Sequence, residues 1–442
     1  KNNKVTKVAL ERNIVVDGGN NASKFLFEVQ YMRKVDYLHT HLFAKIPFPL
    51  AGPTFSDRLS SSVNKQPMDL YEINTYRVLE SALPVQTPRF YYGDISNMTS
   101  NFILITERVP FAEMGGRLDR ALLPLEVEGP YEKCKDWLLR GPAKEYYLKT
   151  FELQARIAGF HKAGKLGDEG FLWQHGLISF FPDATQPEAW GANQLASTGE
   201  PPGAARKKLE TCMRFVSETA KVVFPAYVVE EQFSLKFINT MLKHQAYTLE
   251  IEYYKHHNPD YVALGHMNLN LDNAYFWRDE SGKLDCGMFD FGGFKATSLP
   301  HKVYWALNCA EFEDTKANLE EYIDAFIEMY RGYGGPWLEH GTFRTALILT
   351  ALSNLYFMVS SVPNCLKQCP EKEWATIADR HDPRISANVG GKSTLRTTIQ
   401  ALCNGIRIIE ELKADEVLEG WIQSFWVGGL ERPPKSDEAI NG

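Results

Sequence analysis

The chain has 442 residues, of which 44% are hydrophobic and 23% are charged, and its formal net charge is -7. This length exceeds what one hydrophobic core usually holds, so two lobes or domains are expected. The composition is typical of a soluble globular protein, and the lack of excess positive charge excludes a general nucleic-acid binder.

Residues 1–110 are predicted to form a small β-rich lobe. Its apolar runs are rich in β-branched and aromatic residues and are separated by turn residues, which is typical of an antiparallel sheet. The expected strands are 7–16, 23–33, 41–48, 89–96 and 101–109, with a helix over 68–83 between the third and the fourth.

Residues 111–430 are predicted to form a larger helical lobe, because long segments with helical periodicity replace the strands there. An insert is expected within this lobe at about 164–255. The tail 431–442 has the composition of a linker and is expected to be mobile. Together the two lobes predict an α+β fold, with a small antiparallel β lobe and a large helical lobe.

One segment of the helical lobe, 345–366, contains no charged residue and is long enough to cross a bilayer. Ser353, Asn354 and Pro363 interrupt its apolar character, which favours a buried helix. We therefore expect no transmembrane segment.

The seven cysteines do not form the compact disulfide framework of a small secreted domain in a chain of this length. Cys365 and Cys369 are spaced like half of a metal site, but no second Cys or His pair lies near them. Reduced thiols are expected. No charged-then-apolar leader follows Lys1, so we expect any targeting segment to have been removed and the location to be a reducing intracellular compartment, the cytoplasm or an organelle.

The stretch from Leu264 to Phe294 carries the most informative residues. It is predicted to form a loop with the pattern His266-x-Asn268, followed by a β-hairpin that ends in Asp290-Phe291-Gly292. The hairpin would place Asn273 and Asp290 near each other at its base. An amide oxygen and a carboxylate are hard oxygen ligands of the kind that Mg²⁺ takes.

Phosphoryl transfer also needs a cradle and a cation for the phosphate groups. Gly18 and Gly19 lie in a turn whose backbone N–H groups could cover an anion, although the same residues are ordinary in a hairpin. Lys45 interrupts an apolar strand, and Glu72 on the next helix could hold it. Lys45 could equally be an edge lysine that points at water. The order of all these residues along the chain argues against coincidence.

This order resembles the kinase-like phosphotransferases that modify small molecules, the aminoglycoside, choline and ecdysteroid kinase-like group. The similarity is closest to the ecdysteroid kinase-like branch and covers roughly residues 8–420. That branch has a strand lysine near a proline, a helix with Glu and Tyr four residues apart, and an L-x-H-G-D-L-W-x-x-N loop followed by a hairpin to D-F. The matching residues here are Lys45-Ile46-Pro47, Glu72 with Tyr76, and Leu264 to Asn273 with Asp290-Phe291.

The resemblance implies a bilobal protein-kinase-like fold whose N-terminal lobe binds a nucleotide, with ATP and Mg²⁺ as cofactors. Lys45 would contact the nucleotide phosphates, and Glu72 would hold Lys45. Asn273 and Asp290 would bind magnesium.

The resemblance also implies that the segment from Glu107 to Val109 is the hinge that meets adenine. His266 would brace the loop.

Three residues of the loop depart from the family pattern. Met267 replaces a glycine, Asn268 replaces the catalytic aspartate, and Asn270 replaces a tryptophan or histidine. Three neighbouring differences indicate natural divergence rather than a single engineered change. Asn268 cannot take a proton near neutral pH, and general-base help is worth about 10²–10⁴ in rate, or ~3–5 kcal/mol. Asp272 is a candidate replacement, although the alignment directs its side chain away from the acceptor.

Two functions stay open on the sequence alone. One is a pseudokinase that could keep Mg·ATP and acts as an interaction module for a protein partner. The apolar stretch Trp421 to Leu430 is a candidate surface for this role, although such a stretch more often packs on its own lobe. The other is an active ATP-dependent kinase that phosphorylates a hydroxyl of a small molecule. The acceptor is not predicted by any motif.

Overall fold

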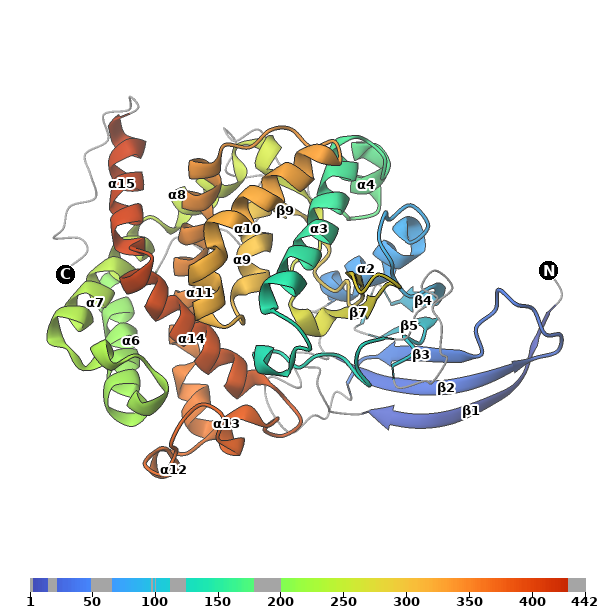
Figure 1. Cartoon of the computed structure of the whole chain (residues 1–442), viewed down its shortest axis with the longest axis horizontal. Coiled ribbons are helices and arrows are strands. Elements are labelled where there is room, and N and C mark those ends of the chain that lie inside the picture. The colour runs from blue at the N-terminus through green and yellow to red at the C-terminus, as the bar shows by residue number, and fades with distance from the viewer. Residues whose placement is uncertain are drawn as a thin grey trace.

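The computed structural model describes residues 3–14, 22–48, 66–96, 98–99, 101–111, 125–178 and 200–427. Gly18 and Gly19, the proposed phosphate cover, lie outside the described residues, as does the tail 431–442. A β-rich part lies at one end of the molecule and the helices are gathered at the other (Figure 1).

The β lobe is a five-stranded sheet in the order β1-β2-β3-β5-β4, with every neighbouring pair antiparallel. All five predicted strands are confirmed. The side chains of each strand alternate between the two faces of the sheet, because successive residues of a strand point to opposite faces. The strands are β1 (Val5–Ile14), β2 (Ser23–Tyr31), β3 (His41–Ile46), β4 (Phe90–Ile95) and β5 (Phe102–Glu107).

The predicted helix of this lobe begins at Gln66 as α2 (Gln66–Asn74) and continues as a π-helical turn, Thr75–Leu79. It buries Ile73, Tyr76 and Leu79 and packs against β4. π-helical turns are uncommon and are often found near functional sites.

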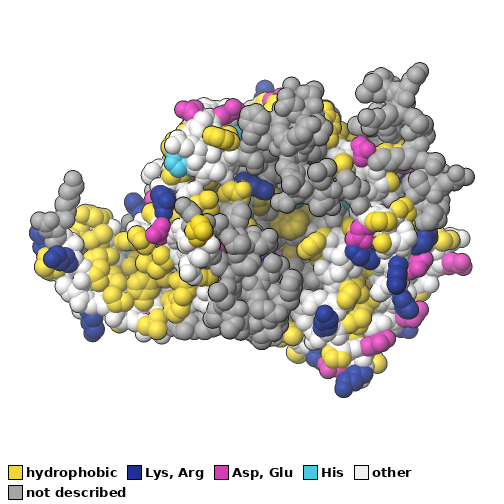
Figure 2. All heavy atoms as spheres, turned by 180° about the vertical axis from the view of Figure 1, so that it is seen from behind, with side chains coloured by type: hydrophobic (Ala, Val, Ile, Leu, Met, Phe, Trp, Pro, Cys, Tyr) yellow, Lys and Arg dark blue, Asp and Glu magenta, His cyan; other side chains and the backbone are white. Residues whose placement is uncertain are grey.

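The outer end of the β lobe carries exposed apolar side chains. Val5, Val8 and Leu10 of the edge strand β1 are each about half exposed or more. Hydrophobic side chains gather over this projecting end when the molecule is seen from behind (Figure 2).

The helical lobe is built around α11, which packs against α9, α10, α14 and α15. Its long helices bury one apolar face each, as their periodicity predicts. The helices are α3 (Ala143–Lys162), α4 (Glu169–Gln174), α6 (Pro202–Arg214), α7 (Glu231–Ala246), α8 (Thr248–His256), α9 (Leu299–Leu307), α10 (Phe312–Gly332), α11 (His340–Gln368), α12 (Glu371–Trp374), α13 (Pro383–Ser386), α14 (Thr394–Glu411) and α15 (Ala414–Val427).

Among the described residues, α11 is the helix that is long and apolar enough to cross a membrane by length and composition. The most apolar window of this helix is 72% buried inside the protein. The charge-free segment is therefore the central helix of the lobe, as the interruptions in its sequence predict.

Two short strand pairs complete the fold. β7 (Ala274–Arg278) and β8 (Leu284–Met288) form the predicted hairpin, and β6 (Val262–Gly265) pairs with β9 (Lys295–Ser298) just before and after it. The pairing of β6 with β9 closes the ends of the whole stretch and was not predicted. A small antiparallel sheet and a large helical lobe thus confirm the bilobal α+β fold class.

Two further predictions from the sequence can be compared with the structure, namely the state of the cysteines and the place of Trp421. All seven cysteines are free, and six of them are buried. Trp421 is only 4% exposed and packs edge-on against the rings of Tyr247 and Tyr254. Trp421 belongs to the core of its own lobe, in agreement with the alternative that this stretch packs on its own lobe, and Gly428 to Leu430 lie outside the described residues; a docking surface in this stretch stays a prediction.

Candidate functional site

Lys45, Glu72 and Asp290 converge at the junction of the two lobes, and we call them the Lys45 cluster. Nζ of Lys45 donates to Oε2 of Glu72 and to Oδ1 of Asp290, each at 2.8 Å. Lys45 lies on β3, Glu72 lies on α2, and Asp290 lies in the segment after β8. Lys45 and Asp290 are 245 positions apart in the sequence. The side chains of Lys45 and Glu72 are less than 10% exposed, whereas that of Asp290 is 47% exposed.

The electrostatics of the cluster favour the charged forms. Burial opposes the charge on Lys45, but the carboxylates of Asp290 and Glu72 raise the pKa of Lys45 above its ordinary value. Enclosure likewise opposes ionisation of Asp290, yet the Lys45 ammonium lowers the pKa of Asp290 below its ordinary value. Lys45 and Asp290 are therefore both ionised at neutral pH, and the half-exposed carboxylate of Asp290 faces outward with an oxygen available to a cation.

A strand lysine held by a helix glutamate, next to a hairpin that ends in Asp-Phe-Gly, is the arrangement that the sequence predicts. The fold is a bilobal kinase-like fold.

Asp290 has a left-handed backbone conformation, with φ of 63°. Such a conformation is uncommon for a residue with a side chain and is held only when its surroundings enforce it. Here the next residue, Phe291, is fully buried and packs edge-on against Tyr76, with ring centroids 4.9 Å apart. The glutamate helix thereby fixes the place of Asp290 through the ring that Tyr76 contributes.

His266 holds the loop to the same segment. Its Nδ1 accepts the backbone N–H of Asn268 at 3.1 Å, so its Nε2 must carry the hydrogen that is donated to the carbonyl of Phe289 at 3.0 Å. Burial lowers the pKa of His266 and favours this neutral form. The bracing role that the resemblance implies for His266 is visible in these two bonds.

Asn273 and Asp290 flank the base of the β7–β8 hairpin. The backbone N–H of Phe289 donates to the carbonyl of Asn273 at 3.1 Å, which brings the neighbours of both side chains into contact. Nδ2 of Asn273 donates to the carbonyl of Asn268 at 2.7 Å, so its amide oxygen is the atom left for a cation. Among the described residues no cluster of three or more His, Cys, Asp or Glu side chains could hold a metal ion.

The side chain of Asn268 is held by Trp305 of α9. The indole Nε1 of Trp305 donates to Oδ1 of Asn268 at 3.1 Å, and the ring of His301 stacks on Trp305 with centroids 5.3 Å apart. Asn268 is half-buried. Sequence reasoning did not find Trp305, because nothing in a helix sequence says which side chain will meet a distant loop.

All three departures from the family pattern contact α9. Met267 lies 3.8 Å from Nζ of Lys302, and Asn268 accepts from Trp305. Nδ2 of Asn270 donates to the carbonyl of Trp305 at 2.8 Å and to that of Ala306 at 3.2 Å, two of the carbonyls left open at the end of the helix. The three differences therefore form one linked set of contacts rather than three separate changes.

Asp272, the candidate replacement base, faces Lys133. Its Oδ2 lies 3.6 Å from Nζ of Lys133, and its buried Oδ1 has no hydrogen-bond partner within the described part of the chain. Burial raises the pKa of Asp272, and Lys133 acts against that rise. Its assignment as a base stays a prediction.

The predicted hinge residues are placed differently from each other. The buried carboxylate of Glu107 accepts the backbone N–H of Arg89 at 3.1 Å and lies 3.4 Å from His39. Val109 instead packs against Tyr275 and Trp277 of β7 in a small apolar cluster with Phe111, Leu125 and Phe289.

Tyr275 and Trp277 were missed by sequence reasoning. Tyr275 lies directly opposite Gly287 in the hairpin, and a side chain on Gly287 would meet the tyrosine ring at 2.2 Å. The ring therefore lies over bare backbone and is stacked on Phe289 at 6.0 Å. The available signal was Gly287 in the predicted strand "LDCGM", because a glycine inside a strand often marks the close approach of another group.

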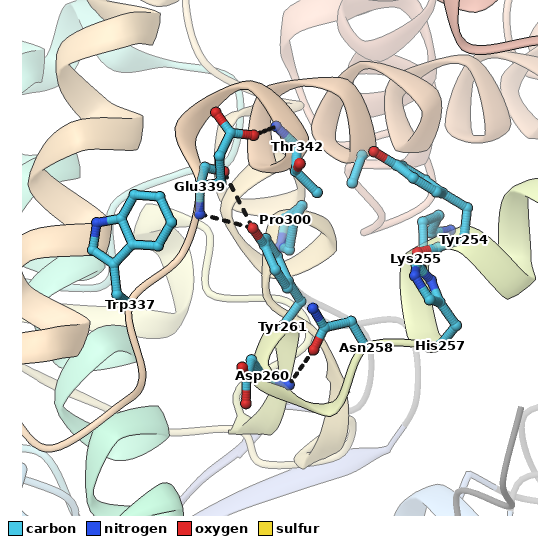
Figure 3. Close-up of a pocket in the computed structure, with 11 residues that line it drawn as sticks. Tyr254, Lys255, His257, Asn258, Asp260, Tyr261, Pro300, Trp337, Glu339 and Thr342 are labelled. Carbon is cyan, nitrogen blue, oxygen red and sulfur yellow. Dashed lines mark hydrogen bonds between the residues drawn. The ribbon is translucent and has the colours of Figure 1, made fainter. Parts of the chain in front are cut away.

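A separate cavity of about 420 Å³ lies in the helical lobe, away from the Lys45 cluster. Figure 3 shows Trp337 and Asp260 at its edge and Tyr261 at its centre, with the tyrosine hydroxyl beside the backbone of Glu339. Its lining contains no residue of the Lys45 cluster or of the loop Gly265–Asn273. It is therefore not part of the predicted nucleotide site.

No protein-family model matches the chain, and comparison with curated proteins gives no match. Solved structures of small-molecule kinases are similar to it over most of its length. They include a microcompartment-associated aminopropanol kinase (14% identity, 93% of this chain and 94% of that chain covered, TM-score 0.39) and ethanolamine kinase from Plasmodium vivax (10% identity, 84% and 81% covered, TM-score 0.39). Spectinomycin phosphotransferase, solved with ADP and spectinomycin, is similar at 10% identity, with 94% and 93% covered and a TM-score of 0.37. Similarities this low assign no activity, so function is inferred below from the geometry of the lobe junction.

Proposed function

We propose that the lobe junction binds Mg·ATP and that the protein is a kinase-like nucleotide-binding module whose phosphoryl transfer lacks a general base. The observation that carries this proposal is the Lys45 cluster, in which one buried ammonium joins a carboxylate of the β lobe to the carboxylate of Asp290 in the segment after β8. A buried lysine is costly unless it is paired, so two partners hold it in place for an anion such as a phosphate group.

Asn273 and Asp290 fit magnesium by their chemistry. An ionised, half-exposed carboxylate and an amide oxygen are hard donors, and Mg²⁺ commonly uses one or two protein ligands with water and phosphate oxygens completing its shell. When bound, magnesium would neutralise charge on the phosphate groups.

Asn268 defines the limit of this function. Its side chain matches aspartate in shape but takes no proton, and Trp305 already uses its oxygen. A module that binds nucleotide and transfers phosphate slowly, or acts as a pseudokinase through a protein partner, follows from that substitution.

The alternative is an active kinase acting on a small molecule. The intact Lys45 cluster favours it, because phosphate positioning and charge neutralisation supply most of the rate in a loose transition state.

Thermal unfolding with increasing Mg·ATP tests the proposal. We expect a saturable rise in unfolding temperature, since a ligand that binds only the folded state stabilises it by about 2.7 kcal/mol at a hundredfold excess over Kd. Transfer to alcohols or water is then compared between the native protein and Asn268→Asp. Restored turnover supports a disabled kinase, and the absence of any nucleotide response in both proteins would overturn the proposal.

A further inference from the structure

The orientation of the Asn268 side-chain amide follows from the hydrogen-bonding chemistry of Trp305. An indole N–H can only donate, so the atom of Asn268 that lies 3.1 Å from Nε1 of Trp305 must be the oxygen. The amide nitrogen, Nδ2, therefore points away from Trp305. Among the described residues none accepts a hydrogen bond from Nδ2 of Asn268, which is a half-buried rather than an enclosed residue.

The amide lies beside the predicted metal ligands. The backbone carbonyl of Asn268 accepts from Asn273, and a side chain on Gly293, three residues after Asp290, would meet Cβ of Met267 at 2.9 Å. In the His-x-Asp-x-x-x-x-Asn pattern of kinase loops, the residue at the position of Asn268 meets the acceptor. Here that residue offers two N–H donors and no oxygen.

We propose that the phosphoryl acceptor is an anionic oxygen, a carboxylate or a phosphate monoester, that accepts a hydrogen bond from Nδ2 of Asn268. This inference rests on the proposed nucleotide site and names its substrate class. Transfer to a hydroxyl is slower by about 10²–10⁴ without a group that takes its proton, and Asn268 offers none. An anionic oxygen has no proton to lose and needs a donor, which is what the amide presents.

The charges nearby agree with this assignment. An aspartate at position 268 would repel an anion beside the triphosphate, and asparagine removes that repulsion. Lys133 lies 3.6 Å from the carboxylate of Asp272, one residue from Asn273, and offsets the negative charge of that carboxylate at the same end of the loop.

The reaction balances without a base. The acceptor oxygen forms a bond to the γ-phosphorus of ATP, while the bond from that phosphorus to the bridging oxygen breaks and its electron pair leaves with ADP. A carboxylate yields an acyl phosphate, and a phosphate monoester yields a diphosphate. No proton is released in either case.

The test observes the amide itself. Protein labelled with ¹⁵N at asparagine is saturated with Mg·ADP, and the side-chain resonance of Asn268 is identified by its loss in Asn268→Leu and Asn268→Asp. Acetate, inorganic phosphate and ethanol are then added separately as probes. We expect acetate or phosphate to move this resonance saturably and ethanol to leave it in place. Which anion does so separates the carboxylate from the phosphate source.

Trp305→Phe provides a second arm, because it keeps a ring but removes the donor that orients the amide. The anion should bind about threefold to tenfold more weakly in this variant, as the loss of one oriented hydrogen bond predicts. A resonance that no anion moves, or that ethanol moves equally, overturns the inference. Failure of Mg·ADP to saturate the native protein defeats the proposed function itself, so the two failures are distinguishable.

Discussion

The two sides of the lobe junction differ in charge. On the proposed nucleotide side, the carboxylates of Glu72 and Asp290 both lie within hydrogen-bond distance of Nζ of Lys45. On the proposed acceptor side, Asn268 is hydrogen-bonded to the indole of Trp305 and the imidazole of His266, and its own side chain is neutral. Ion pairing is kept where phosphate and cation would be held, and proton-accepting capacity is missing where an acceptor would lie.

The difference indicates that nucleotide binding and proton removal are separable in this fold. The hydrogen bonds of the Lys45 ammonium go to Glu72 and Asp290, whereas the indole of Trp305 donates to Asn268. A substitution in the Lys45 cluster should therefore leave the contacts of Asn268 measurable, and a substitution in α9 should leave nucleotide binding measurable. The following variants test this expectation.

The largest effect is expected from Lys45→Met. Removing the ammonium leaves Glu72 buried without this partner, which costs about 3–5 kcal/mol of folding free energy. The nucleotide-dependent rise in unfolding temperature should vanish as well. Lys7→Met is the control, because Lys7 is an exposed lysine on the edge strand β1 of the same sheet.

The pH dependence of this loss has a definite sign. The pKa of Asp290 is lowered in the folded state, so its contribution to stability is present above the unfolded value of about 3.9 and is lost as the pH falls below it. Denaturant unfolding should show the gap between native protein and Lys45→Met narrowing in acid. A gap that stays constant there would mean that the Asp290 pair contributes nothing.

Lys302→Met tests whether the Lys302 side chain, on the proposed acceptor side, is uncharged in the folded protein. Lys302 is 1% exposed and, among the described residues, its ammonium meets only the carbonyl of Thr297 and the sulfur of Met267. Burial lowers the pKa of Lys302 well below its ordinary value. Between the folded and unfolded pKa values the unfolded chain binds a proton that the folded chain lacks, so stability falls as the pH falls.

The methionine variant should therefore be more stable than the native protein at neutral pH. Its advantage should grow by ~1.4 kcal/mol for each pH unit below about 10, until the folded pKa is reached. Urea unfolding at several pH values measures this slope. Equal slopes for the two proteins would show that Lys302 stays charged and that the acceptor side holds a cation.

Trp305→Phe should have the smallest effect on stability. It removes one hydrogen bond to Asn268, worth about 0.5–1.5 kcal/mol. The shift in unfolding temperature caused by Mg·ADP is expected to survive. If that shift disappears as it does for Lys45→Met, the two sides of the junction are one unit and the comparison fails.

The sequence predicts the elements of the fold well because their signals are local. Alternating apolar residues mark the five strands, and the interruptions at Ser353 and Pro363 separate α11 from a membrane helix. The convergence of Lys45, Glu72 and Asp290 was predicted only through the order of motifs, since periodicity does not relate residues so far apart.

The contacts of α9 could not be predicted in the same way. That Trp305 holds Asn268, and that Lys302 is buried beside Met267, depends on which face a nine-residue helix turns toward a distant loop. The same limit applies to Glu107, whose carboxylate accepts from Arg89 and lies near His39, while its place near adenine stays a prediction. Side-chain partners across a lobe follow from tertiary packing.

The central position of α11 has a consequence for synthesis on the ribosome. The helices α14 and α15, which cover much of this apolar segment, are translated after it. A nascent chain that has reached Gln368 therefore presents a long apolar helix before α14 and α15, which cover it, have been synthesised. Chaperone binding or transient adsorption to lipid should peak at that chain length and decline once Glu411 has emerged.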